Sequence, residues 1–156
     1  MIKSIQAVLL FLFCSSISAV EIGDSIPSCN RLDLSEYKNK VLLIDFWATW
    51  CPPCKQSMPF LNALRNELAD KGFEIIAINV DEETEVAQNF LNNYPVDYPV
   101  VFDPKGECPL AYDVKAMPSS YFVDKKGKIR YVHFGFRHQD ESEIRARVLE
   151  LLKRVL

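Results

Sequence analysis

The sequence predicts a single α/β domain in which helices flank a central mixed β-sheet. Two apolar runs, residues 41–47 and 73–80, are too short for helices and rich in strand-forming residues. A segment with apolar residues at helical spacing separates them, and a strand–turn–strand signal with a final helical stripe follows later in the chain. Strands that alternate with helices and then end in a hairpin and a helix are typical of an α/β sandwich.

The first strand and helix are predicted from the middle of the chain. Residues 41–47, Val-Leu-Leu-Ile-Asp-Phe-Trp, predict a buried strand because the run is almost entirely apolar. Residues 54–71 predict a helix, which Gly72 ends. Its apolar stripe consists of Met58, Leu61, Leu64 and Leu68. Residues 73–80, Phe-Glu-Ile-Ile-Ala-Ile-Asn-Val, predict a second buried strand.

Shorter elements are predicted in the next part of the chain. Apolar residues between positions 86 and 91 mark a short helix that ends at Tyr94-Pro95, since proline cannot continue a helix. Residues 98–102 read as a short strand, and residues 109–112 as one or two helical turns.

The chain closes with a predicted hairpin and helix. Residues 119–123 and 128–134 flank the turn at 124–127, which is a hairpin signal. Asp140 followed by Glu143 predicts a capped N-terminus for the last helix. The apolar stripe of that helix consists of Ile144, Val148, Leu151, Leu152 and Val155.

Composition and charge argue for an ordinary globular protein. The chain has 156 residues, and its 49% hydrophobic and 25% charged content is typical of a folded domain. The net charge is −3, with no basic stripe, so nucleic acid is not expected as a partner.

The first nineteen residues differ from the rest. Lys3 is their only charged side chain, an apolar run covers residues 7–14, and small residues lead up to Ala19. This pattern is that of a secretory signal peptide, which we expect to be cleaved after Ala19; an uncleaved N-terminal anchor is the alternative. The sequence therefore predicts a signal peptide or anchor at 1–19, a domain at 20–156, and a location in the periplasm or on the extracytoplasmic face of a membrane.

Two of the four cysteines in that domain form the motif Cys51-Pro-Pro-Cys54, between the first predicted strand and helix. Free N–H groups at a helix N-terminus stabilise an anion, so the pKa of Cys51 is expected to be lowered and its thiolate to be a good nucleophile. Cys54, one turn later, is within disulfide reach and is expected to be more covered. Pro52 and Pro53 suit the first helical turn, where a missing N–H costs little, and Trp50 supplies an apolar rim for a protein partner.

A static bridge or a metal site are the alternatives for this pair. Closing a two-residue loop removes little chain entropy, so a purely structural bridge would stabilise little. The other cysteines, Cys29 and Cys108, are isolated and do not match zinc-ligand spacing, so no metal site is predicted.

The sequence also resembles a known family along nearly the whole domain. Residues 42–64, LLIDFWATWCPPCKQSMPFLNAL, resemble the active-site strand and helix of the thioredoxin superfamily, and most of all exported TlpA/ResA/DsbE-type thiol-disulfide oxidoreductases. EIIAINVDEE and the helix after it resemble the extra βα segment of those proteins. Residues 111–129 resemble their second active-site loop and hairpin. The resemblance implies a thioredoxin-like fold that needs no organic cofactor or metal.

The resemblance assigns roles to individual residues. Cys51 matches the attacking cysteine and Cys54 the resolving cysteine. Pro118, after Met117, matches the family's cis-proline, whose preceding backbone pairs with the bound substrate; a trans proline at a strand entrance is the alternative reading. Pro59 matches the proline that kinks the active-site helix.

Asp45 is the most informative polar residue, because a carboxylate in an apolar strand is costly without a partner or a function. Burial should raise its pKa. It matches the buried acid of thioredoxin, which serves in proton transfer to and from the resolving cysteine; a structural aspartate is the alternative. Many relatives carry Asn there and a Glu three residues after the second cysteine, where this chain has Ser57. That departure argues against assuming a cytochrome c maturation partner.

The remaining candidates have several readings. Cys29 and Cys108 form a structural disulfide, remain two buried thiols, or act as a further redox relay; the disulfide is favoured. His133 and His138 are expected to be surface or packing residues. Lys55 and Lys115 are expected to be solvated, with a contribution to the partner surface as the alternative.

Together these observations predict an extracytoplasmic enzyme that reduces protein disulfides and is itself re-reduced by another protein, which in this family is often membrane-embedded. An oxidase or isomerase with the same site is the main alternative, because the motif does not fix the reduction potential. A peroxidase is less favoured, since Ile44 stands where the peroxiredoxin signature requires proline. A non-enzymatic adaptor is the third alternative.

Overall fold

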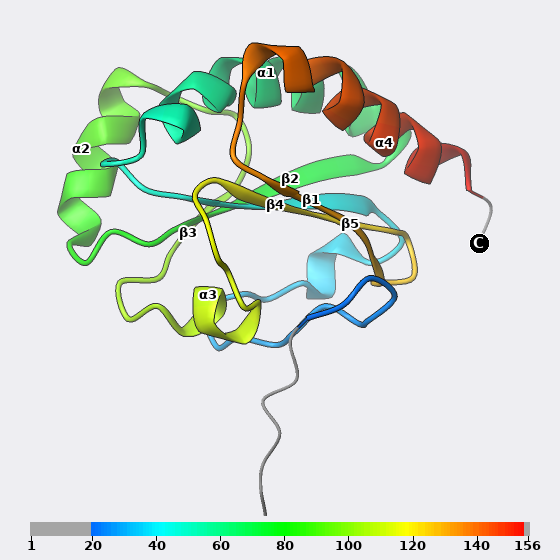
Figure 1. Ribbon diagram of the computed structural model, residues 1–156, viewed down its shortest axis with the longest axis horizontal. Coiled ribbons are helices and arrows are strands. Elements are labelled where there is room, and N and C mark those ends of the chain that lie inside the picture. Colours follow the sequence, from blue (N-terminus) through cyan, green and yellow to red (C-terminus); the bar gives the residue numbers. More distant parts are fainter. Residues whose placement is uncertain (1–19, 155–156) are drawn as a thin grey trace, which may run out of the picture.

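The computed structural model describes residues 20–154, and within them five strands form one mixed sheet in the order β3-β2-β1-β4-β5 (Figure 1). The predicted signal peptide or anchor at 1–19 lies outside these residues. The strands are β1 (Val41–Trp47), β2 (Phe73–Asn79), β3 (Val100–Phe102), β4 (Ser119–Val123) and β5 (Ile129–Phe134). The helices are α1 (Pro52–Leu68), α2 (Thr84–Asn93), α3 (Glu107–Ala111) and α4 (Glu141–Lys153). Short 3₁₀ turns cover Ser35–Tyr37, Ala69–Lys71 and His138–Asp140.

Strand β1 lies at the centre of the sheet. It pairs in parallel with β2 and antiparallel with β4. Every residue of β1 and β2 is buried, which explains why both strands read as continuous apolar runs. The predicted α/β fold with a mixed sheet flanked by helices is therefore confirmed.

The two faces of the sheet carry separate hydrophobic cores, because successive strand residues point to opposite sides. Val41, Leu43 and Trp47 pack with α1 and α4 on one face, which we call the α1 face. Leu42, Ile44 and Phe46 pack with α3 and the N-terminal segment on the other, the α3 face. Figure 1 shows α1 and α4 side by side above the sheet and α3 below it.

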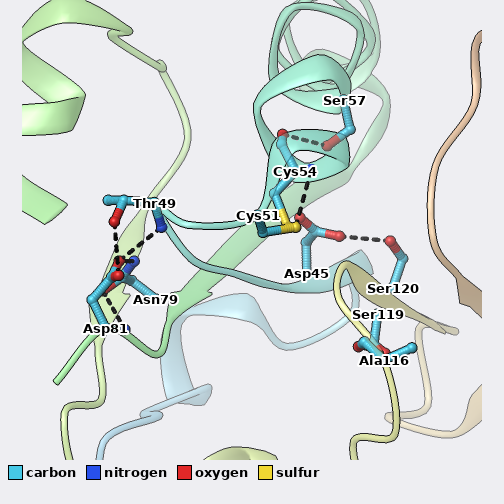
Figure 2. Close-up of a disulfide and its surroundings, with 10 residues drawn as sticks. All are labelled: Asp45, Thr49, Cys51, Cys54, Ser57, Asn79, Asp81, Ala116, Ser119 and Ser120. Carbon is cyan, nitrogen blue, oxygen red and sulfur yellow. Dashed lines mark hydrogen bonds between the residues drawn. A yellow bond between two sulfur atoms is a disulfide. The ribbon is translucent and has the colours of Figure 1, made fainter.

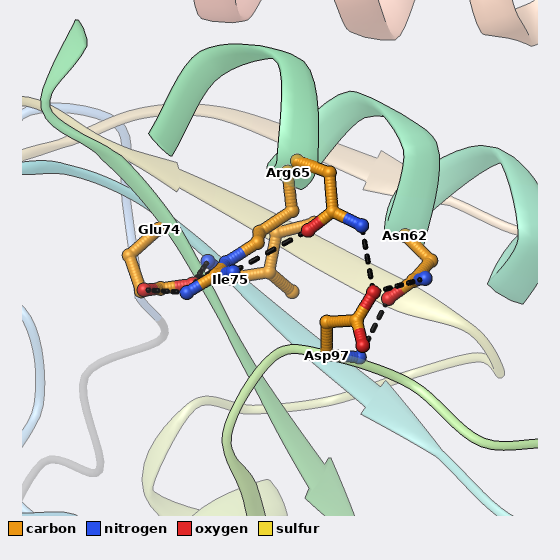
Figure 3. A network of polar contacts seen from close by, with 6 residues as sticks. Asn62, Arg65, Glu74, Ile75 and Asp97 are labelled. Atoms are coloured by element: carbon orange, nitrogen blue, oxygen red, sulfur yellow. Dashed lines mark hydrogen bonds and ion pairs between the residues drawn. The ribbon is translucent and has the colours of Figure 1, made fainter. Parts of the chain in front are cut away.

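Polar contacts tie α1 to its neighbours (Figure 3). Arg65 forms a two-pronged ion pair with the buried Glu74 of β2, with Nε–Oε1 and Nη2–Oε2 distances of 2.9 and 3.0 Å. The side-chain amides of Asn62 and Asn66 both donate to Asp97, in the loop before β3. These contacts, with the apolar stripe beneath, fix α1 against the sheet.

The element boundaries differ from the prediction in a few places. Helix α1 begins at Pro52 rather than at Cys54, because both prolines fit its first turn. Strand β3 begins at Val100, and Tyr98 is instead buried in the loop before it. Gly72 ends the helical segment in the left-handed conformation, with φ of 87°, which glycine adopts without strain.

The predicted cap of the last helix is right in its position but wrong in its contact. Asp140 does stand at the N-cap position of α4, but its side chain makes no cap hydrogen bond there. Its Oδ2 accepts instead from the backbone N–H of Arg137, at 2.8 Å. The Asp140 carboxylate thus caps the 3₁₀ turn before α4 instead of α4 itself. Glu143 forms an ion pair with Arg147 rather than a capping contact with Asp140.

Cys29 and Cys108 are joined by a disulfide that spans 79 positions of sequence. Cys108 is fully buried in the core of the α3 face, so the bridge fastens the N-terminal segment to α3. Of the three readings of this pair, the structure contains the disulfide.

Replacing Cys29 and Cys108 together by alanine should lower the free energy of unfolding by roughly 2–4 kcal/mol, because a long loop is no longer closed in the unfolded chain. Denaturant unfolding measures the change. In the matched control, Cys51 and Cys54 are both replaced by alanine. Its free energy of unfolding should fall much less, because the loop closed by that disulfide is short. Equal losses in the two double variants would contradict this account.

Candidate active site

The Cys51–Cys54 pair forms a disulfide where β1 passes into α1. Cys51 occupies the N-cap position of α1, and its Sγ accepts a hydrogen bond from the backbone N–H of Cys54 at 3.2 Å. The backbone N–H of Lys55 reaches only the Cys51 carbonyl, at 3.3 Å. Once the bridge is reduced, the helix N-terminus can stabilise a thiolate on Cys51.

The disulfide is recessed behind an exposed aromatic rim. Cys51 and Cys54 are 3% and 1% exposed, whereas the side chain of Trp50 is 64% exposed. The expected difference in cover between the two cysteines is therefore small in this oxidised state. An open groove of about 480 Å³ lies beside the pair. It is lined by Trp50, Cys51, Pro52, Pro53, Val114, Lys115, Ala116 and Met117.

The groove brings together most of the residues expected to bind substrate. Met117 lies on its wall, and the Met117–Pro118 peptide bond is cis, the isomer that the resemblance implies. Pro118 itself is buried and does not line the groove. Val114 and Ala116 also line the groove. The sequence reading did not single them out, although both lie in the second active-site loop that the resemblance implies at 111–129.

Asp45 is buried on the α1 face of β1, the face that carries the cysteines (Figure 2). It is 4% exposed, and burial raises the pKa of its carboxyl to about 7. Its Oδ1 accepts a hydrogen bond from the Ser120 hydroxyl at 2.6 Å, which offsets part of that rise. A carboxyl that titrates near neutral pH can both accept and release a proton at the working pH.

Ser57 occupies the position where many relatives carry an acid. It is buried, and its hydroxyl donates to the Cys54 carbonyl within α1 at 2.9 Å (Figure 2). In the view of Figure 2, Asp45 lies below the cysteine pair on the strand and Ser57 lies above it on the helix. Of the two, only Asp45 can take up a proton at neutral pH.

A second buried carboxylate, missed by the sequence reading, holds the loop that leads to Cys51 (Figure 2). Asp81 accepts from the backbone N–H and the hydroxyl of Thr49, at 2.9 and 2.8 Å. The Asn79 amide donates to the same carboxylate at 2.6 Å. The parallel pairing of β1 and β2 could have suggested this contact, since their carboxyl ends meet at one edge of the sheet.

The other expected residues lie around the site or away from it. Lys115 lies on the groove wall and pairs with Asp113, while Lys55 packs its ammonium group 4.1 Å from the ring centre of Tyr94. His138 is exposed and pairs with Glu141, whereas His133 lies in β5 and is taken up below.

The two disulfides lie in different cores. Cys51 and Cys54 belong to the core of the α1 face, and Cys108 to that of the α3 face. Within residues 20–154 no three His, Cys, Asp or Glu side chains gather as a metal site would require. In the same part of the chain, no helix is long and apolar enough to cross a membrane.

A redox-active cysteine pair at the start of a helix, on a mixed sheet with a cis-proline loop opposite, defines the class of thioredoxin-like thiol-disulfide oxidoreductases. Comparison with known proteins agrees. The model of the Redoxin family matches residues 23–148, and the chain belongs to that family.

Curated relatives and solved structures support the same class. A thiol-disulfide oxidoreductase ResA from Bacillus thuringiensis subsp. konkukian is 36% identical over 117 residues, covering 70% of this chain and 68% of the relative. The ResA of Geobacillus kaustophilus is 30% identical over 148 residues, covering 90% and 83%. A crystal structure from Chlorobium tepidum, assigned as thiol:disulfide interchange protein DsbE, matches with a TM-score of 0.83 and 37% identity, covering 86% of this chain and 99% of that one.

Replacing Asp45 by asparagine should stabilise the oxidised protein at alkaline pH. The pKa of Asp45 is about 7 in the folded state and near 3.8 when unfolded, so the native protein loses stability as pH rises between these values. The loss approaches about 4 kcal/mol above pH 7 as an upper bound, at 1.36 kcal/mol per unit. The free energy of unfolding should be higher for the variant than for the native protein at pH 8, and the same for both at pH 4. An equal difference at both values would contradict the raised pKa.

Proposed function

We propose that this protein is an extracytoplasmic reductase of protein disulfides, with Cys51 as the nucleophile and Cys54 as the resolving thiol. The observation that carries the proposal is the position of the pair. The disulfide caps a helix N-terminus and lies beside an open groove rimmed by an exposed tryptophan. Such a place suits an extended polypeptide that brings its own disulfide to the Cys51 sulfur.

The proposed cycle begins with both cysteines reduced. The Cys51 thiolate attacks one sulfur of the substrate disulfide, and the substrate's other sulfur leaves as a thiolate that takes up a proton. Cys54 then gives its proton to Asp45 and attacks the Cys51 sulfur, which releases the second substrate sulfur as a thiolate that takes up a proton from solvent. Two electrons pass to the substrate, and the Cys51–Cys54 bridge is the oxidised product. A dithiol protein, in the membrane or outside it, must reduce the bridge again.

Substrate binding is assigned to the groove. Trp50, Pro52 and Pro53 would form one wall and Met117 the other, with the backbone before Pro118 pairing with the substrate strand. The groove's lining by these side chains supports the assignment. We also propose that residues 20–156 are the catalytic domain and that residues 1–19 direct export or anchor it, as their apolar run suggests.

The direction of electron flow separates a reductase from an oxidase or isomerase. Asp45 favours the reductase, because a buried base with a pKa of about 7 assists the attack of Cys54. The equilibrium reduction potential of the Cys51–Cys54 pair should fall below about −200 mV, in the range of reducing rather than oxidising family members. Equilibration with glutathione or dithiothreitol measures it. A potential near −120 mV, that of a strong oxidant, would contradict the assignment.

A trapping experiment tests the cysteine roles. The Cys54→Ser variant of the full chain, exposed to the host's exported proteins, should accumulate mixed disulfides through Cys51, because the resolving step is blocked. Non-reducing gels with mass spectrometry would identify them. Cys51→Ser is the matched control and should trap at least tenfold less, since the remaining thiol lies behind the groove. Equal trapping by the two variants would sink the assignment of Cys51 as the nucleophile.

A further inference from the structure

Polar side chains form a row across the sheet beneath α1. In the register of the sheet, Asp45 of β1 lies opposite Ser120 of β4, and Ser120 lies opposite His133 of β5. Residues directly opposite one another point to the same face, with Cβ atoms about 4.5–5.5 Å apart. His133 is therefore the next polar side chain beyond the Ser120 hydroxyl that donates to Asp45.

His133 lacks the partners that a buried imidazole normally has. Its side chain is 16% exposed, and its Nε2 atom is buried with no hydrogen-bond partner among residues 20–154. The Oδ2 atom of Asp140 lies 3.5 Å from that nitrogen, longer than a well-formed hydrogen bond. Buried polar atoms without a partner are uncommon in folded proteins and call for a functional or structural reason.

Asp140 places the outer end of the row near the protein surface. Its side chain is 10% exposed and its Oδ2 is held by the Arg137 backbone N–H, while the Arg137 guanidinium lies 3.6 Å away. This is the carboxylate that the sequence predicted as a helix cap. Its actual position, turned toward β5, leaves it facing His133.

The proposed cycle gives Asp45 a proton in every turnover, and that proton must leave. Asp45 is almost fully buried, and the cysteine pair and α1 cover the face toward which it points. In the sheet, the polar contact that leads away from it is the Ser120 hydroxyl. A serine hydroxyl can accept one hydrogen bond while it donates another, so it can pass a proton along.

We propose that Ser120, His133 and Asp140 form a proton relay that connects Asp45 with solvent; this inference rests on the proposed role of Asp45 in resolution. The protonated Asp45 donates to the Ser120 oxygen as the Ser120 hydroxyl proton moves to His133. The imidazolium that results is stabilised by Asp140 and releases its proton to water at the edge of α4. No electron moves in these steps, and the proton count is conserved.

Charged and titratable groups lie at both ends of the relay. Burial raises the pKa of Tyr98, in the loop before β3, and the charge of Asp45 raises it further. Asp140 faces His133 from the turn before α4, and the Arg137 guanidinium lies 3.6 Å from the Asp140 carboxylate. A pH dependence of the rate can therefore be assigned to His133 only by comparing variants, because Asp45, Arg137, Asp140 and Tyr98 lie around the same relay.

The two histidines of the chain supply a matched pair for the test. We would reduce a peptide disulfide with the full-length, pre-reduced protein and follow release of the second peptide thiol between pH 6 and 8. His133→Gln should slow this resolving step by about tenfold, less than the 10²–10⁴-fold typical of losing a general base. Added imidazole should restore the rate. His138→Gln, a change at an exposed site, should match the native protein with or without imidazole.

Asp45→Asn separates failure of the relay from failure of the proposed function. A slow Asp45→Asn with His133→Gln at the native rate would overturn the relay and leave the proposed cycle intact. A native rate for both would overturn the role of Asp45 as well. A slow His133→Gln that imidazole does not restore would show only a structural role and would also overturn the relay.

A second variant covers the case in which His133→Gln fails to fold. Ser120→Ala removes the hydroxyl that joins Asp45 to His133, so it should also slow the resolving step by about tenfold. Release of the second peptide thiol at the native rate in Ser120→Ala would overturn the relay.

Discussion

The junction between β1 and α1 is the constraint on which the rest of the site depends. The buried central strand β1 ends at Trp47, and after a short turn the chain enters helix α1, whose first two residues are prolines. Cys51 is thereby fixed as the N-cap, where free N–H groups and the helix dipole act on its sulfur. The Asp81–Thr49 contacts hold the turn from the β2 side, and the Arg65–Glu74 pair holds the helix further along. The reactivity of the sulfur thus follows from the packing of the elements behind it.

Asp45 shows what this arrangement costs. A carboxylate buried in the middle of a sheet with one serine as its hydrogen-bond partner is destabilising when ionised, which is why its pKa rises. An isosteric apolar residue would make a more stable strand. An acid with a pKa near neutrality exchanges protons readily under working conditions, which supports the proton transfer that we propose between Cys54 and Asp45. The Ser57 hydroxyl does not exchange protons in this way, so the proposal assigns that step to the strand.

Local signals in the sequence were sufficient for much of this structure. The buried strands, the active-site helix and the hairpin follow from apolar runs, helical spacing and turn residues. The Cys-Pro-Pro-Cys motif is recognisable by itself and shows where the site lies in the sequence. Contacts between distant segments were harder to predict. The parallel pairing of β1 and β2 could have suggested the Asp81–Thr49 contact, and the resemblance placed Val114 in the second active-site loop, but neither shows which side chains meet. The row from Asp45 to His133 depends on a strand register that one sequence does not reveal. Asp140 was misread for a related reason, since a cap pattern looks the same whichever N–H the carboxylate accepts from.

The sheet also keeps two kinds of cysteine chemistry apart. Thiol–disulfide exchange requires a thiolate to reach a disulfide sulfur, and a packed sheet admits no such approach. The Cys51–Cys54 pair lies in the core of the α1 face and opens on the groove, whereas Cys108 is fully buried in the core of the α3 face. A thiolate formed at Cys51 therefore cannot attack the Cys29–Cys108 bridge without unfolding of the domain. The same chain can cycle one disulfide while the other keeps its N-terminal segment in place.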